Sequence, residues 1–148
     1  MSDAPTDTPD AAARVQYGVL PYREADGVQV LLVTSRETKR WIIPKGWPMK
    51  DRSPAAAAAQ EALEEAGVTG VAEDQPLGSY GYMKKRKDGS FVPCEVTVFP
   101  MRVDEVHEHW LEEGQRSREW FSLADAALAV GEGELKALIL DFGWSRRA

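Results

Sequence analysis

The 148 residues include 24 Asp and Glu and 18 Lys and Arg, a formal net charge of −6 at pH 7, and 43% of them are hydrophobic. This length and composition are typical of a single globular domain with a sizeable core. The negative charge argues against general binding to nucleic acid or to an anionic membrane surface. We therefore expect neither of these partners.

The first twelve residues differ in composition from the rest of the chain. They are acidic and rich in Pro, Thr and Ala, which predicts a disordered tail at residues 1–12 ahead of one domain over residues 13–148. They lack the basic start and apolar middle of a signal peptide. No apolar run approaches the ~20 residues of a membrane span. We expect a cytoplasmic protein.

Apolar runs rich in β-branched residues predict six strands. In chain order they cover residues 15–22, 28–34, 41–43, 75–84, 91–103 and 117–121. Asp88 and Gly89 indicate a hairpin between the fourth and fifth runs, because both residue types accept positive φ angles. Helical patterns cover residues 54–66, 123–130 and 134–142. Because strands and helices are mixed without regular alternation, we expect an α/β or α+β layered domain instead of a doubly wound sheet.

The helix predicted at residues 54–66 has clear ends. Ser53 is a favoured N-cap residue, and Pro54 occupies the first turn, where its missing N–H costs nothing. Gly67 stands where a helix ends in the left-handed conformation. The stretch SPAAAAAQEALEEAG therefore carries its own start and stop signals.

Three glutamates share one face of this helix. At 100° per residue, Glu61, Glu64 and Glu65 fall within an arc of ~100°. The opposite arc carries small or apolar residues, namely Ala55, Ala59, Ala62, Leu63 and Ala66. Like charges four residues apart cost a helix ~0.2–0.5 kcal/mol per pair. Either the face is plain solvated surface, or a divalent cation such as Mg²⁺, which prefers oxygen ligands, offsets the repulsion.

The loop before the helix favours the cation. It follows a buried-looking strand and is rich in Gly and Pro, as scaffolded loops that carry function often are. Cationic residues gather around its approach, namely Arg36, Lys39, Arg40, Lys45 and Lys50. Since Mg²⁺ usually shares the phosphates of a substrate, an anionic ligand is expected beside it.

Residues 46–68 resemble the signature of the Nudix hydrolases, G-x5-E-x7-R-E-U-x-E-E-x-G-U, in which U is a bulky aliphatic residue. The matching positions are Gly46, Glu61, Glu64, Glu65, Gly67 and Val68. Arg52 stands where the signature has its first Glu, and Gln60 stands where it has Arg. The flanking stretches are similar to those of the diphosphoinositol polyphosphate phosphohydrolases, which also cleave diadenosine polyphosphates. These stretches are VLLVTSR (30–36), RWIIPKGWP (40–48), VDEVHEHW (103–110) and SREWF (117–121).

The resemblance implies an α/β/α sandwich with a mixed β-sheet and a hydrolase that depends on Mg²⁺, with Mn²⁺ as the other candidate ion. The substrate would be a polyphosphorylated, anionic small molecule with a phosphoanhydride bond, of which diphosphoinositol polyphosphates and diadenosine polyphosphates are favoured. Because Gln60 and Arg52 depart from the signature, the alternative is a catalytically weakened domain that binds a nucleotide or polyphosphate as a regulatory module. Dimers are common among relatives, so a homodimer is one candidate assembly, and the sequence itself does not indicate the oligomeric state.

The resemblance also implies roles for single residues. Glu61, Glu64 and Glu65 would be catalytic, and they and the Gly46 carbonyl would bind the metal. Glu64 would be a ligand or the general base, for which the other candidates are Glu95, Glu105 and Glu108. Substrate contacts are expected from Arg14, Arg36, Lys45, Lys84, Lys85, Arg116 and Arg118. The two lysines belong to a basic hairpin tip that is either an electrostatic guide for the substrate or a cationic turn that protects a sheet edge.

Overall fold

The computed structural model describes residues 13–146. A mixed sheet of eight strands forms its centre, with the order β3-β2-β1-β7-β5, and β4, β6 and β8 pair with β1, β7 and β2. The strands are β1 (Arg14–Glu24), β2 (Val28–Thr34), β3 (Trp41–Ile42), β4 (Lys45–Gly46), β5 (Val68–Ala72), β6 (Gly78–Lys85), β7 (Phe91–Val106) and β8 (Arg118–Ser122). β1 and β7 run parallel, whereas the other pairs are antiparallel. The tail predicted at residues 1–12 lies outside the described residues.

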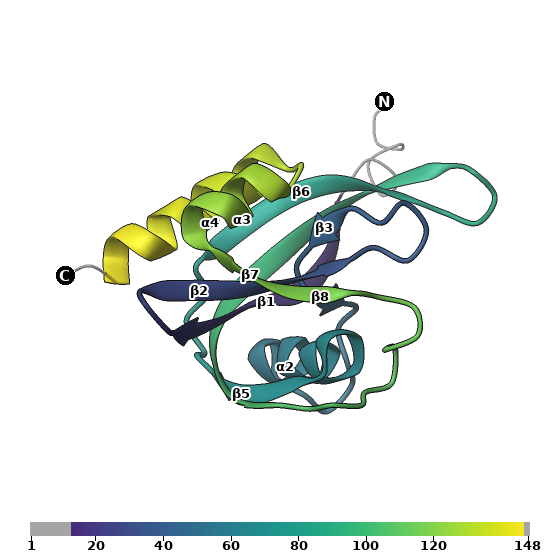
Figure 1. Cartoon of the computed structure of the whole chain (residues 1–148). Helices are drawn as coiled ribbons and strands as arrows, with labels where there is room; N and C mark the ends of the chain where they lie inside the picture. The colour runs from purple at the N-terminus through teal and green to yellow at the C-terminus, as the bar shows by residue number, and fades with distance from the viewer. Residues whose placement is uncertain (1–12, 147–148) are drawn as a thin grey trace.

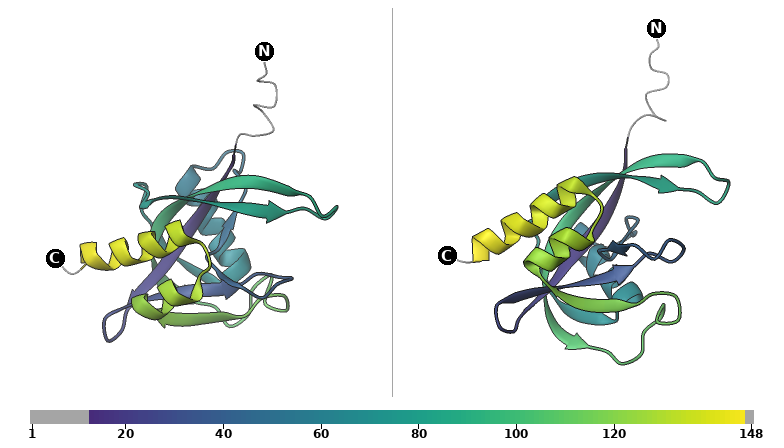
Figure 2. Two further views of the ribbon diagram at one scale, coloured as in Figure 1. Left: turned by 90° about the horizontal axis from the view of Figure 1, so that it is seen from above. Right: turned by 45° about the horizontal axis from the view of Figure 1, so that its top comes forward.

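Helices cover both faces of the sheet. α2 (Pro54–Ala66) packs on one face, and α3 (Leu123–Ala129) and α4 (Gly133–Arg146) pack on the other, as Figures 1 and 2 show. The predicted α/β/α sandwich with a mixed sheet is therefore confirmed. No helix in residues 13–146 is both long enough and apolar enough to cross a bilayer.

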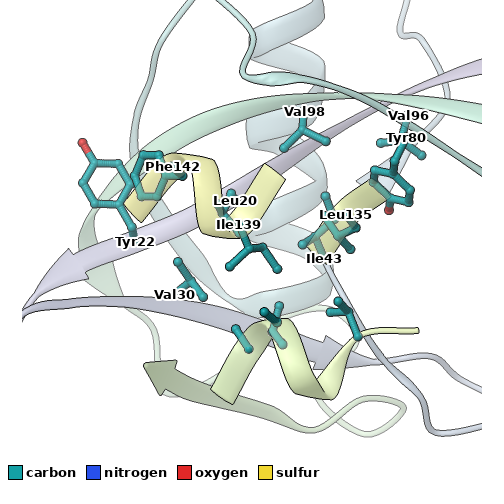
Figure 3. Close-up of a cluster of buried hydrophobic side chains, with 14 residues drawn as sticks. Leu20, Tyr22, Val30, Ile43, Tyr80, Val96, Val98, Leu135, Ile139 and Phe142 are labelled. Carbon is teal, nitrogen blue, oxygen red and sulfur yellow. The ribbon is translucent and has the colours of Figure 1, made fainter. Parts of the chain in front are cut away.

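The two helical layers bury two apolar clusters, because successive strand residues point to opposite faces. Leu20 belongs to the cluster under α3 and α4, whereas its neighbour Val19 belongs to the cluster under α2. In the first cluster Phe142 of α4 lies against Tyr22, with ring centroids 5.0 Å apart (Figure 3). In the second, the alanines of α2 let the helix lie close to the sheet.

The structure contains the predicted strands and helices with small shifts at their ends, and it has two further strands, β4 and β5, that were not predicted. β4 is only two residues long, and β5 starts directly after the helix-terminating Gly67, so neither carries a separate apolar run. The buried face of α2 is also rotated from the predicted arc. Ala58 and Glu65 are buried, whereas Ala59 and Leu63 are only half-buried.

Candidate active site

Local signals place the acidic helix as the sequence predicts. The Ser53 side chain accepts a hydrogen bond from the Ala56 amide at 3.2 Å, and Pro54 is the first helical residue. Gly67 ends the helix with a φ of 68°, in the left-handed region that glycine adopts without strain. The α2 helix therefore begins and ends at its predicted caps.

Glu61 lies directly against the backbone of Gly46. β4 brings Gly46 beside Tyr17 of β1, and a Cβ atom added to Gly46 would overlap the carboxyl group of Glu61. Only a glycine leaves room for this approach. The structure therefore brings together two of the residues predicted to bind a metal.

Glu65 is the most buried of the three glutamates, with 6% of its surface exposed. Its Oε1 accepts a hydrogen bond from the Lys45 amide at 3.2 Å, and its Oε2 lies 3.5 Å from Nη2 of Arg116. Burial raises the pKa of Glu65 in spite of the two neighbouring cations. An ionised Glu65 therefore depends on the positive charge around it.

Glu61 and Glu65 form a repelling pair. Burial, the negative charges of Glu65 and Glu64 and a hydrogen bond to Glu65 together raise the pKa of Glu61 to about 8, and burial is the largest cause. Two carboxyl groups this close hold a proton between them when no cation is present. The pair is thus a place where a cation and a proton compete.

Glu64 points to a different partner. Its Oε2 accepts a hydrogen bond from Nε2 of Gln60 at 2.9 Å. Within residues 13–146, no group of three or more His, Cys, Asp or Glu side chains is arranged to hold a metal ion. The donor chemistry nevertheless fits a hard divalent cation, since the close pair offers carboxylate oxygens only. Glu61 and Glu65 would hold such an ion, and Glu64 would have to leave Gln60 to join them.

A fourth carboxylate comes from the loop at residues 107–116. Glu112 accepts a hydrogen bond from Nε of Arg116 at 2.7 Å, and its charge acts on both Glu61 and Glu65. Glu112 was not among the residues predicted from the sequence, because only the fold brings the 107–116 loop to α2. Of the predicted general bases, Glu105 and Glu108 have side chains that are 71% and 92% exposed, and Glu95 is also exposed.

The C-terminal end of α2 is held from outside the helix. The carbonyl of Glu64 accepts a hydrogen bond from the Glu112 amide at 3.0 Å, and that of Glu65 accepts one from the Trp110 indole Nε1 at 3.1 Å. The Ala66 carbonyl accepts from Nη1 of Arg118 at 2.9 Å, and the carbonyl of the capping residue Gly67 accepts from the His107 amide at 2.8 Å. These carbonyls would otherwise have no partner within the helix. The loop that carries Glu112 is thereby fixed to the acidic helix.

Arg118 occupies a structural position in this arrangement. Its guanidinium group lies 3.8 Å from the centre of the Trp110 ring, and its Nη2 donates a hydrogen bond to the His107 carbonyl at 2.7 Å. With the hydrogen bond to the Ala66 carbonyl, both terminal nitrogens of the Arg118 guanidinium group donate to backbone carbonyls. The geometry thus favours a helix-capping role for Arg118 over the predicted contact with substrate.

Replacing Arg118 by Ala is expected to lower the free energy of unfolding by about 1.5–3 kcal/mol or more, because hydrogen bonds to a charged group are lost. Urea unfolding measures the difference, with Arg102→Ala as the control. The Arg102 side chain is 61% exposed and pairs only loosely, at 3.6 Å, with Asp104. Unchanged stability together with weaker substrate binding would restore the original prediction for Arg118.

Three of the other cations predicted to bind substrate lie near the acidic helix or the 107–116 loop. Arg116 is nearly buried, with 7% of its side chain exposed, and its Nη1 donates to the Thr34 carbonyl at 3.1 Å. Arg36 is exposed, and its Nη1 lies 3.4 Å from Oε1 of Gln115 in the 107–116 loop. Lys45 is half-buried and its Nζ lies 5.0 Å from the centre of the Tyr82 ring. Arg116 and the Lys45 amide therefore contact Glu65 of the acidic cluster, whereas Arg36 contacts only the 107–116 loop beside it.

Burial also affects the charge of Lys45. It lowers the pKa of this lysine to about 8, while the nearby carboxylates of Glu65 and Glu132 oppose the shift. Lys45 is still mainly protonated at pH 7. Lys84 lies close enough to influence it, whereas Lys85 and Arg14 are exposed and the structure gives them no contact with the glutamates.

The fold and the acidic site define a class of protein, an α/β/α sandwich with a carboxylate site suited to a hard divalent cation. The family model described as NUDIX domain matches residues 12–142. The chain therefore belongs to the Nudix family, as residues 46–68 predict.

Two relatives show the range of similar proteins. Nudix hydrolase 4 of Arabidopsis thaliana is 38% identical over 125 residues, which cover 78% of this chain and 58% of that protein. Diphosphoinositol polyphosphate phosphohydrolase 3-beta of Bos taurus is 36% identical over 110 residues, 72% of this chain and 63% of that protein. The chain thus spans about six tenths of the length of these relatives.

Solved structures support the fold. An Ap4A hydrolase from C. elegans superposes with a TM-score of 0.67 at 21% identity, over 88% of this chain and 96% of that chain. At this level of identity the likeness concerns the fold alone.

Proposed function

We propose that this chain hydrolyses a phosphoanhydride bond in a polyphosphorylated small molecule and depends on Mg²⁺, or on Mn²⁺ in its place. The observation that carries the proposal is the close pair of Glu61 and buried Glu65 against Gly46, at the positions of the Nudix signature. A divalent cation would relieve the repulsion of this pair, and carboxylate oxygens are ligands that Mg²⁺ prefers. The substrates we favour are diadenosine polyphosphates and diphosphoinositol polyphosphates, the classes that two of the similar proteins carry in their names.

Each residue of the site has a task in this reaction. Glu61 and Glu65, with the carbonyl of Gly46, hold the ion, which when bound neutralises charge on the substrate phosphates. Glu64 is either a further ligand or the base that takes a proton from the attacking water, and Glu112 is a second candidate for this base. Lys45 and Arg36 bind phosphate oxygens and orient the bond that breaks.

Arg116 has a different task, because its partners are already on the protein. It reaches Glu65 and Glu112 from the 107–116 loop. In the Nudix signature an arginine at position 60 orients the neighbouring carboxylates, and this chain has Gln60 there. We infer that Arg116 supplies the positive charge that position 60 lacks. This favours an active enzyme over the alternative of a weakened regulatory module that only binds a nucleotide or polyphosphate.

The test is hydrolysis with Mg²⁺ across a panel of diadenosine polyphosphates, diphosphoinositol polyphosphates, nucleotide sugars and nucleoside triphosphates. Glu64→Gln is compared with the wild type, and Glu119→Gln, an exposed glutamate of β8, is the matched control. Turnover of one class that is lost only in Glu64→Gln supports the proposal. Binding without any turnover would favour the regulatory module.

Gln60→Arg is expected to raise kcat/KM or metal affinity by up to about tenfold, since it adds a charge-assisted contact to the acidic face. Metal titration of the hydrolysis rate measures both quantities. A lower activity would mean that the contact of Gln60 with Glu64 is already the productive one.

The assembly, binding partners and cellular location of the protein remain predictions. We expect no general nucleic-acid binding and a cytoplasmic location, although several relatives carry the words mitochondrial or chloroplastic in their names. A homodimer is one candidate assembly. The basic hairpin tip with Lys84 and Lys85 would attract an anionic substrate, together with Arg14 at the start of β1.

A further inference from the structure

Part of the sheet extends beyond the helix that covers it. β6 and β7 form a hairpin that projects from the body of the protein, as Figure 2 shows. Phe99 of β7 packs under α2 and its neighbour Val98 packs under α3 and α4, so the odd-numbered residues of β7 face the α2 side. In residues 91–97 the even-numbered residues are buried, whereas the odd-numbered ones are half-buried or exposed. Along the hairpin, the α2 side of the sheet is therefore open.

This open face carries apolar side chains. Met83 of β6 and Phe91 of β7 are 57% and 58% exposed, and Pro93, the strand partner of Met83, follows Phe91 on the same face. Val15 of β1, which pairs with Glu95, is 41% exposed. The solvated face of an antiparallel sheet is normally polar, and contiguous exposed apolar side chains mark an interaction surface. We therefore expect a partner on this face.

A pocket of about 450 Å³ continues the open face toward the start of α2. We call it the Tyr17 pocket, because Tyr17 lies two residues beyond Val15 on the same face of β1. Its walls are mainly apolar and include Tyr17, Phe99, Pro54 and Pro76. Among the residues that the structure describes, the one charged side chain in its lining is that of Asp74, which is exposed. Pockets of this size hold ligands larger than a phenyl ring, so an aromatic group beside a cation would fit it.

The tip of the hairpin offers this combination. Phe91 is the strand partner of Lys85, so the ring and the ammonium group lie side by side on the open face. Arg86 and Lys87 follow in the turn, and all three cations are exposed. Lys84 belongs to the opposite face, where its charge acts on Lys45. The tip and the Tyr17 pocket are therefore complementary in both polarity and charge.

We propose that two copies of this chain form a dimer in which Phe91 of each copy enters the Tyr17 pocket of the other and Lys85 pairs with Asp74. The tip and the pocket lie on one face of the same sheet, so a two-fold symmetric contact makes both pairs at once. Phe91 and Thr97, which also lines the pocket, are ~20 Å apart along β7 at ~3.4 Å per residue. A two-fold axis midway between them exchanges their positions. The inference goes beyond the proposed function, because assembly requires no turnover.

Sedimentation velocity of the full chain, from about 1 µM to about 100 µM, measures the association. The wild type is expected to form dimers within this range. Phe91→Ser is expected to weaken the dimer by about 30-fold or more, because it removes a buried aromatic anchor. Leu128→Ser is the matched control, since Leu128 is 79% exposed but lies on α3, on the other side of the sheet.

Two charge reversals test the contact between Lys85 and Asp74. Lys85→Glu and Asp74→Lys each place like charges at both contacts of the symmetric dimer, and each is expected to weaken it by about tenfold or more. In an equimolar mixture of the two variants, a mixed dimer has opposite charges at both contacts. It is expected to form with about the affinity of the wild type. A misfolded variant would not regain association on mixing.

A wild type that stays monomeric up to about 100 µM would overturn the inference and leave the open face to a different partner. A dimer that Phe91→Ser does not weaken would also overturn it, because another surface would then join the copies. The same holds if the two charge variants fail to associate when they are mixed. Hydrolysis is measured separately, so failure of the proposed activity leaves the outcome of this experiment unchanged.

Discussion

Glu61→Gln is expected to lower kcat/KM for the phosphoanhydride substrate by more than about 100-fold. Replacing a residue that only supports a metal ligand typically lowers metal affinity or activity by about 10–100-fold. Loss of a direct carboxylate ligand should therefore have a larger effect. Gln keeps the size of the side chain and removes the charge that holds the ion. Steady-state kinetics with saturating Mg²⁺ measure the effect, with Glu119→Gln as the control.

The same substitution is expected to stabilise the protein when metal is absent. The pKa of Glu61 rises from its ordinary value of 4.5 to about 8 in the folded state, because burial and two neighbouring carboxylates disfavour its charge. Between these two pH values the folded state binds more protons than the unfolded state, so stability falls as pH rises through this window. Because a glutamine cannot ionise, Glu61→Gln removes this decrease of stability with pH.

Thermal unfolding in EDTA separates this prediction from simple damage to the fold. Glu61→Gln should unfold at a higher temperature than the wild type at pH 8, and the difference should shrink toward pH 4.5. A variant that is inactive and also less stable at pH 8 would mean that the loss of activity has a structural cause.

Gly46→Ala is expected to lower activity by about 100-fold while the fold is retained, since a shift of about 1 Å in a reacting group can cost this much. The added methyl group would overlap the Glu61 carboxyl group, which must then move away from β4. Gly114→Ala is the matched control, because a Cβ atom at Gly114 meets no atom within 4 Å.

Kinetics and metal titration of the two glycine variants give the comparison. Weaker metal affinity in Gly46→Ala alone would agree with the close approach of Glu61 to the backbone. Equal activity of the two variants would contradict the position of Glu61 against Gly46.

The acidic helix could be predicted from the sequence because its signals are local. Ser53, Pro54 and Gly67 mark its ends within a few residues, and the glutamates fall on one face by helical spacing alone. Most of the strands follow from similarly short apolar runs, and the layered fold follows from the irregular mixture of strands and helices. The family signature adds the expected role of each glutamate.

Other parts of the site depend on contacts between distant segments. Glu112, Arg118 and Glu132 lie 47 or more residues from Glu65 in the chain, and only the fold brings them to α2 or to Lys45. β5 was missed since its five residues merge with the end of α2. The sequence shows that Arg118 is cationic, but its direction toward backbone carbonyls is a property of the folded chain.

The central claim is that Glu61 and Glu65 together bind a divalent cation, and Mn²⁺ binding followed by electron paramagnetic resonance tests it most directly. The wild type should bind Mn²⁺, Mg²⁺ should displace it, and Glu61→Gln and Glu65→Gln should each weaken the binding by about tenfold or more. Equal Mn²⁺ binding by the wild type and both variants would contradict the claim.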